Sequence, residues 1–348
     1  MRAAIQQSLL CGTAALGAEV HTSPIGETRV DYHTCKSGAC DSCGNWRAIR
    51  WEEEAASQFA GIPFWSVLLT MPKFFWGLLC DNPRLLPALP TLGAGVLTDW
   101  ARERFSAEVL IVCVCQTFNP LLECNVHLHI LVSRIGLHLN GNSRVQNIYF
   151  PVDLIRERWR KALLDLLELE ARKGRLRSEL SVDELLKTIA YQRECLWKVG
   201  VRPCLNNRAN LKYIARYLRR PPMTDSRILW FDAKHVCFLY KDKRDGNREH
   251  EATVPIAEFI ARFVQQVPRR YRHGVRYFGL LAPRAKTTRY QVYLRLLSLP
   301  FPRRVRRRRW AESLRRRFGF DPLIDSRGNR MTWSHRLPPQ PLHATRAP

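Results

Sequence analysis

Two histidines lie two residues apart in the segment Asn125-Val126-His127-Leu128-His129. On a β-strand, residues two apart point to the same face, so His127 and His129 should project together while Leu128 points to the other face. Neutral imidazole nitrogens are common ligands of divalent metals. The pair therefore predicts a metal site, and hydrogen-bonded scaffold histidines in a buried strand are the alternative.

Two tyrosines have the spacing of one helical turn in residues 211–217, LKYIARY. On a helix, Tyr213 and Tyr217 would stand one above the other, at the border of an apolar face. The opposite flank is cationic and comprises Arg208, Lys212, Arg216 and Arg219, with Arg220 next in the chain. A metal that polarises a phosphate, a phenol oxygen that attacks it and cations that hold its neighbours would make a nuclease. Tyrosines at a core edge, with their hydroxyls in water, are the alternative.

A cysteine cluster near the N-terminus has the spacing of a structural zinc site. Cys35-x4-Cys40-x2-Cys43 supplies three thiolates, and either Cys11 or His33 would supply the fourth ligand. One zinc is expected, with a metal-free remnant of a zinc fold as the alternative. The chain is long, so we expect six other cysteines to be reduced core or incidental residues: Cys80, Cys113, Cys115, Cys195, Cys204 and Cys237.

The charge balance points to a polyanionic partner. Among 348 residues there are 56 Lys and Arg against 31 Asp and Glu, a formal net charge of +25. We see neither an apolar run long enough to span a membrane nor the pattern of a signal peptide. A nucleic-acid-binding protein without a membrane partner, located in the cytoplasm, is therefore expected.

Strand and helix patterns alternate along the chain and predict an α+β fold, an antiparallel sheet layered by helices. Strands are expected at 64–71, 108–117, 126–133 and 235–242, and helices at 156–173, 181–198, 206–220 and 256–267. A hairpin centred near Leu121 and Leu122 would place Gln116 opposite His127. Gln116 is thus a candidate third metal ligand, with Glu123 and Asn125 behind it. A glutamine that caps a strand end is the alternative.

The histidine and tyrosine motifs together make the family recognisable. His127-Leu128-His129 followed by Tyr213-x-x-x-Tyr217 resembles the two-tyrosine HUH transposases, which are rolling-circle insertion-sequence transposases with an N-terminal zinc-binding segment. The resemblance spans most of the chain. It includes CGTAALG at 11–17, YHTCKSGACDSC at 32–43, LLTMP at 68–72, RYLRRPP at 216–222, EFIARFVQQVP at 258–268, YFGLLAPR at 277–284 and WAESLRRRFGFDPL at 310–323.

The resemblance implies a metal-dependent nick of single-stranded DNA, with Mg or Mn at the HUH pair. Tyr213 and Tyr217 would be the nucleophiles, one of them taking the 5′ phosphate as a phosphotyrosine, and His127 and His129 would be the metal ligands. The partner would be single-stranded DNA, at hairpin ends of an insertion sequence, in a nucleoid-associated bacterial enzyme. The implied division is a zinc-ribbon-like segment at 1–60, a catalytic domain at 61–222, a basic DNA-associated region at 223–337 and a disordered tail at 338–348.

The chain departs from the family pattern at two places. Members usually carry a Cys-x2-Cys pair between the positions of Cys11 and Cys35 and another after the DPL motif, but HTSPIG at 21–26 and IDSRGNRM at 324–331 hold no cysteine. A second zinc is therefore not expected. The same departure keeps open a non-catalytic DNA-binding relic, beside a plasmid replication initiator or relaxase of the same chemistry.

Overall fold

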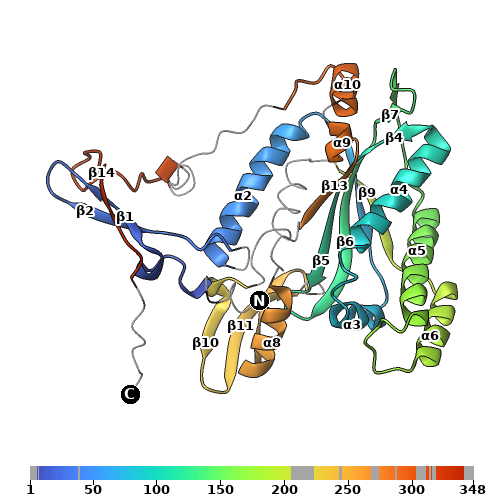
Figure 1. Cartoon of the computed structure of the whole chain (residues 1–348), viewed down its shortest axis with the longest axis horizontal. Coiled ribbons are helices and arrows are strands. Elements are labelled where there is room, and N and C mark those ends of the chain that lie inside the picture. Colours follow the sequence, from blue (N-terminus) through green and yellow to red (C-terminus); the bar gives the residue numbers. More distant parts are fainter. Residues whose placement is uncertain are drawn as a thin grey trace. The chain divides into compact units, whose positions relative to one another are not determined.

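The computed structural model describes residues 6, 8–37, 40–204, 223–242, 245–267, 274–286, 288–302, 311–312, 315 and 319–340. The chain divides into two compact units (Figure 1). The smaller unit joins residues 1–47 to residues 304–348, so both ends of the chain belong to it. The larger unit comprises residues 48–303.

The larger unit is built on a five-stranded antiparallel sheet with the strand order β13-β5-β6-β3-β9. Its strands are β3 (Phe64–Leu69), β5 (Leu110–Phe118), β6 (Cys124–Ser133), β9 (Val199–Pro203) and β13 (Val275–Gly279). Valine, isoleucine and leucine dominate β5 and β6, as expected for strands buried on a packed sheet. His127 and His129 lie on β6, the middle strand.

Helices lie along one side of this sheet and form the main core with it (Figure 1). They are α3 (Lys73–Asp81), α4 (Leu89–Phe105), α5 (Val152–Arg172) and α6 (Val182–Glu194). The even-numbered residues of β6, including Val126, Leu128 and Ile130, are buried against this layer. Because side chains alternate along a strand, His127 and His129 face the opposite side of the sheet.

A second core covers one end of that opposite side. Its buried residues come from α2 (Asp41–Gln58), α10 (Arg289–Leu296) and the sheet, and include Trp51, Phe59, Phe64, Val112, Leu131, Tyr290 and Tyr293. The Trp51 indole N–H donates to the Tyr277 hydroxyl at 2.7 Å. His127 and His129 lie beyond this core and are half-buried.

Two smaller sheets complete the larger unit. One is β10 (Ile228–Phe231), β11 (His235–Asp242) and β12 (Arg248–Pro255), and the other is β4 (Ala107–Glu108), β7 (Gly136–His138) and β8 (Arg144–Val145). The short helices are η2 (Asp225–Arg227) and α9 (Pro283–Lys286). Helix α8 (Ile256–Gln266) packs on β11 and also holds the β5–β6 hairpin. Its Gln266 amide oxygen accepts from the Thr117 hydroxyl at 2.7 Å, and Arg262 donates to the Leu121 carbonyl at 2.9 Å.

The smaller unit pairs the two ends of the chain in one sheet of order β14-β1-β2. Its elements are η1 (Ala14–Leu16), β1 (Ala18–Thr22), β2 (Thr28–Tyr32) and β14 (Thr332–Leu337). Gly17 connects η1 to β1 with φ +79°, and a Cβ there would lie 2.8 Å from the Leu337 carbonyl oxygen. Glycine is therefore required where the C-terminal strand meets the N-terminal one.

The mixed helical and antiparallel architecture expected from the sequence is confirmed, with two local corrections. The helix expected at 181–198 ends at Glu194, because Cys195 is extended and the chain continues into β9. Helix α2 begins at Asp41, where no helix was among those expected from the sequence. In the described part of the chain, no helix combines the length and the apolarity that a membrane span needs.

The expectation that Cys80 is a reduced core residue is wrong. Cys80 and Cys124 form a disulfide, with their Cα atoms 6.6 Å apart. Cys80 lies near the end of α3 and Cys124 begins β6, and α3 packs against β6. Packing of these two elements brings the sulfurs together, and the sequence separation of 44 gave no sign of it.

Candidate metal centres

The β5–β6 hairpin brings the first candidate site together. Gln116 is the register partner of His127, as the hairpin centre predicted, and Val114 is the partner of His129. The Asn119 side-chain oxygen shapes the turn by accepting from the backbone N–H groups of Leu121 and Glu123 at 2.8 and 3.0 Å. A polar side chain that replaces backbone partners in this way fixes the register of the two strands.

The two imidazoles converge on one point. Their Nε2 atoms are 3.0 Å apart, and the rings meet nearly edge to face with centroids 4.8 Å apart. His127 Nδ1 lies 2.9 Å from the Asn125 carbonyl oxygen. A carbonyl can only accept, so that contact places a proton on Nδ1 and leaves the Nε2 lone pair for a ligand.

Gln116 completes this group. Its amide N–H donates to the Phe118 carbonyl at 2.8 Å, which turns Oε1 to within 3.2 Å of His129 Nε2. Gln116 therefore supports the strand end and also directs an oxygen at the histidines. We call Gln116, His127 and His129 the His–His–Gln site.

This donor set fits a small divalent cation. With metal–ligand distances of about 2.1 Å, neighbouring ligands of an octahedral ion lie roughly 3 Å apart. The separations of 3.0 and 3.2 Å between the donor atoms match that spacing. Of the alternative ligands, Glu123 is engaged in the hairpin, where its carboxylate accepts from Asn119 at 2.8 Å and lies 3.7 Å from Arg262.

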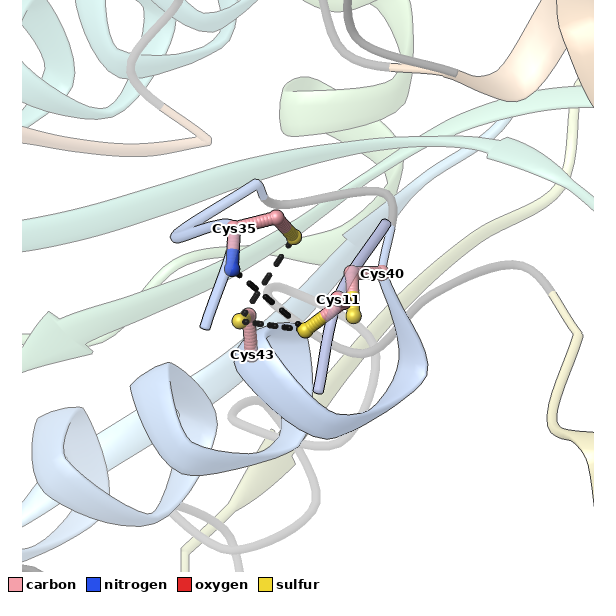
Figure 2. A group of neighbouring side chains, drawn as sticks. All are labelled: Cys11, Cys35, Cys40 and Cys43. Carbon is pink, nitrogen blue, oxygen red and sulfur yellow. Dashed lines mark hydrogen bonds between the residues drawn. The ribbon is translucent and has the colours of Figure 1, made fainter. Parts of the chain in front are cut away.

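The second candidate site is a group of four cysteines in the smaller unit. The Sγ atoms of Cys11, Cys35, Cys40 and Cys43 all lie within 4.8 Å of one another (Figure 2). Cys43 Sγ is 3.7 Å from the sulfurs of both Cys11 and Cys35. Tetrahedral zinc with bonds of about 2.3 Å needs sulfurs roughly 3.8 Å apart. We call these residues the four-cysteine site.

The thiols of this site perturb one another. Burial, and then contact with Cys11, raises the pKa of Cys43 to about 11. Burial likewise raises the pKa of Cys40 well above its usual range. At Cys35 burial also acts to raise the pKa, but the Ser37 backbone N–H and the other cysteines outweigh it, so the pKa is lowered. Without a metal, the four-cysteine group favours one thiolate over several. A bound divalent cation would stabilise further thiolates.

Of the two candidates for the fourth zinc ligand, the structure places Cys11 and not His33 in the group. His33 is engaged elsewhere. Its ring nitrogens lie 2.9 Å from the Leu16 carbonyl and 3.1 Å from the Glu19 carboxylate. His33 joins η1, β1 and the end of β2, and it does not face the sulfurs.

The expected nucleophiles and their cationic flank lie outside the described residues. This holds for Tyr213, Tyr217, Arg208, Lys212, Arg216, Arg219 and Arg220. Their roles stay predictions from the sequence.

The sequence interpretation missed the neighbours of the His–His–Gln site on β3 and β9. Leu68 of β3 is the register partner of His129 on one side and of Gly200 on the other. Ser66 is likewise opposite Arg202. The alternation of Val199 and Val201 with Lys198, Gly200 and Arg202 was the available sequence signal for β9. The segment is too short for this alternation alone to distinguish a strand from a continuation of the preceding helix.

Comparisons with known proteins identify the class. The chain matches a transposase family described as "Putative transposase" over residues 111–289, more than half of its length, and therefore belongs to this family. Residues 1–71 match a second model, described as "Transposase zinc-binding domain". The family match includes the His–His–Gln site, and the zinc-binding match includes the four-cysteine site. The second match and the grouped thiols support a structural zinc.

Two curated relatives narrow the class. The transposase for insertion sequence element IS801 from Pseudomonas savastanoi pv. phaseolicola is 29% identical over 295 residues, covering 80% of this chain and 70% of the relative. "Putative transposase y4qJ" from Sinorhizobium fredii is 26% identical over 307 residues, covering 84% of this chain and 77% of the relative. A comparison with solved structures found no match. The resemblance drawn from the motifs is thus confirmed at the level of the family, whose members act on DNA.

Proposed function

We propose that this transposase nicks single-stranded DNA and transfers the cut strand through a covalent 5′-phosphotyrosine, in rolling-circle transposition of an insertion sequence. The observation that carries the proposal is the placement of His129 Nε2 within 3.0 Å of His127 Nε2 and 3.2 Å of Gln116 Oε1. Two imidazole nitrogens and an amide oxygen at these separations are spaced as ligands of one divalent cation would be. Membership of the transposase family supplies the DNA substrate.

In this proposal a Mg or Mn ion held by the His–His–Gln site supplies Lewis acidity at the scissile phosphate. Tyr213 or Tyr217 forms a bond from its phenol oxygen to phosphorus, and the bond from phosphorus to the 3′ oxygen breaks. The phenol proton leaves to solvent and the released 3′ oxygen takes one up. Because one phosphoester bond replaces another, no nucleotide hydrolysis is needed. The second tyrosine allows a second cleavage and strand transfer.

The chain's own residues hold the site and the substrate. The Asn125 carbonyl fixes the His127 tautomer, and the Phe118 carbonyl fixes the Gln116 amide. We assign phosphate contacts on single-stranded DNA to the cationic residues around the tyrosines, namely Arg208, Lys212, Arg216, Arg219 and Arg220. Hairpin ends of the insertion sequence are the proposed form of the substrate.

The competing function is a DNA-binding relic without catalysis, motivated by the two absent cysteine pairs. The intact His127, His129, Tyr213 and Tyr217 argue against it, because all four proposed catalytic side chains persist in the sequence. A replication initiator or relaxase is disfavoured by the match to the transposase zinc-binding domain.

The test uses a single-stranded oligonucleotide labelled on the 3′ side of its cleavage site, incubated with the full chain and Mn²⁺. We expect a covalent protein–DNA adduct that survives denaturation and maps to Tyr213 or Tyr217. The Tyr213→Phe/Tyr217→Phe double variant should bind the oligonucleotide and form no adduct. Tyr191→Phe, an exposed tyrosine on α6, is the matched control and should form the adduct normally. An adduct in the double variant would place the nucleophile elsewhere, and none in the parent at any insertion-sequence end would favour the relic.

A further inference from the structure

Arg202 of β9 and Lys198, the residue directly before β9, are two cations on the same side of the sheet as the His–His–Gln site. Val199 and Val201 pack against the main core on the helical side. By alternation, Gly200 and Arg202 face the opposite side, and we take Lys198, directly before β9, to continue the same alternation. The register confirms this, since Gly200, Leu68 and His129 lie in one row across β9, β3 and β6.

The position of Lys198 follows from the row of residues next to Gly200, Leu68 and His129. Thr70 follows β3 directly, and its hydroxyl donates to the Lys198 carbonyl at 2.5 Å. Leu69 is the register partner of Leu128. Thr70, the next residue along the chain, therefore lies level with His127. Strands lie about 4.8 Å apart, so β9 runs roughly 10 Å from β6.

The charges of β9 differ from those of the helical layer. On α5 and α6, several cations are neutralised by nearby carboxylates: Arg158 by Glu103, Lys161 by Asp165, Arg172 by Glu168, and Arg193 by Asp165 and Glu168. Lys198 and Arg202 are exposed, and no carboxylate of the described residues lies within ion-pair distance of either. Positive charge without an internal partner, beside a phosphate-cutting site, fits an external anion.

Gly200 lies between the two cations in the sequence and places no side chain over the β9 backbone. A Cβ at this position would meet only the Leu68 Cβ, at an ordinary 3.7 Å. Glycine is therefore not imposed by the packing of β3 against β9. Its absent side chain permits close approach of a ligand to the β9 backbone.

We propose that Lys198, Gly200 and Arg202 form a binding track for the phosphodiester backbone of the DNA strand held at the His–His–Gln site. Lys198 and Arg202 bind successive stretches of the backbone, and Gly200 lets the strand lie against the sheet between them. This binding track rests on the proposed function. It adds the path that the substrate strand takes away from the His–His–Gln site.

The experiment measures binding of a single-stranded oligonucleotide to the full chain at several salt concentrations, without catalysis. The Lys198→Ala/Arg202→Ala variant should bind more weakly and lose about 1.4 from the slope of log affinity against log salt, or about 0.7 per phosphate contact. Its Mn²⁺ affinity should equal that of the parent, because neither residue touches the metal ligands. Lys173→Ala/Lys187→Ala removes the same charge from exposed positions on the helical side and is the matched control.

A salt slope in Lys198→Ala/Arg202→Ala equal to that of the parent would overturn the track, and so would an equal loss in the control. Gly200→Val adds bulk with no loss of charge, so it should weaken binding and leave the slope unchanged. Parent-like binding by Gly200→Val would contradict close approach at Gly200, provided that its melting temperature matches the parent. These readouts need no cleavage, so the track and the tyrosine chemistry can fail separately.

Discussion

The four-cysteine site and the His–His–Gln site differ in the number and kind of ligands that they offer to a metal. In the small unit, four thiols lie with their sulfurs within 4.8 Å of one another, and burial and the neighbouring thiols raise the pKa of Cys43. The His–His–Gln site has three donors on adjacent strands and half-buried imidazoles. A structural zinc is saturated by protein ligands, whereas a catalytic metal keeps positions for substrate. The proposed function accordingly assigns folding to the four-cysteine site and chemistry to the His–His–Gln site.

The largest expected effect is loss of nicking on removal of a histidine. His127→Ala should lower adduct formation by about a thousandfold, because the Lewis-acidic metal loses one of its ligands. Oligonucleotide binding and zinc content should stay at parent levels. His235→Ala, at a half-buried histidine on β11, is the control and should nick normally. If His127→Ala nicks as fast as the parent at limiting metal, the His–His–Gln site is not catalytic.

The next effect falls on the other site. Cys43→Ser should reduce zinc from about one ion per chain to none and expose residues 1–47 to protease, because the small unit would lose the ion that joins its segments. Chelation of the parent should do the same. Cys195→Ser, a half-buried cysteine away from the site, should retain zinc. Zinc-free parent protein after careful preparation would instead favour a metal-free remnant.

A smaller effect is expected at the third ligand. Gln116→Ala should weaken Mn²⁺ binding about 10- to 100-fold, as loss of a ligand or its support commonly does. Gln116→Glu should bind Mn²⁺ at least as well as the parent, because it keeps the oxygen and adds charge. Isothermal titration of the full chain gives both affinities. Parent-like affinity in Gln116→Ala would show that Gln116 only caps the strand.

The smallest effect should come from His33. His33→Ala should leave zinc affinity within about twofold of the parent, because His33 contacts Glu19 and Leu16 and not the sulfurs. Competition with a zinc-binding dye measures it. Loss of zinc in this variant would show that His33 replaces one of the thiols.

Local patterns predicted much of this molecule because they depend on near neighbours. The alternation in β6 placed His127 and His129 on one face, and the turn near Leu122 set Gln116 opposite His127. The spacing of Cys35, Cys40 and Cys43 indicated their cluster.

The rest depends on contacts between distant segments, which residue patterns do not contain. Pairing of β1 with β14 joins the two ends of the chain, and β9 reaches β3 from far along the sequence. The choice of Cys11 over His33 also required the fold, because only the path of β1 and β2 directs His33 to Glu19. The bond from Cys80 to Cys124 followed from the packing of α3 on β6.

The contrast between the two sites can be tested in one crystal of the full chain grown with Mn²⁺. Anomalous diffraction recorded at the zinc and manganese edges locates each metal separately. The account predicts a zinc peak among Cys11, Cys35, Cys40 and Cys43 and a manganese peak between His127, His129 and Gln116. Manganese absent from the histidines, or zinc held there by a full set of protein ligands, would contradict an open catalytic site beside a closed structural one.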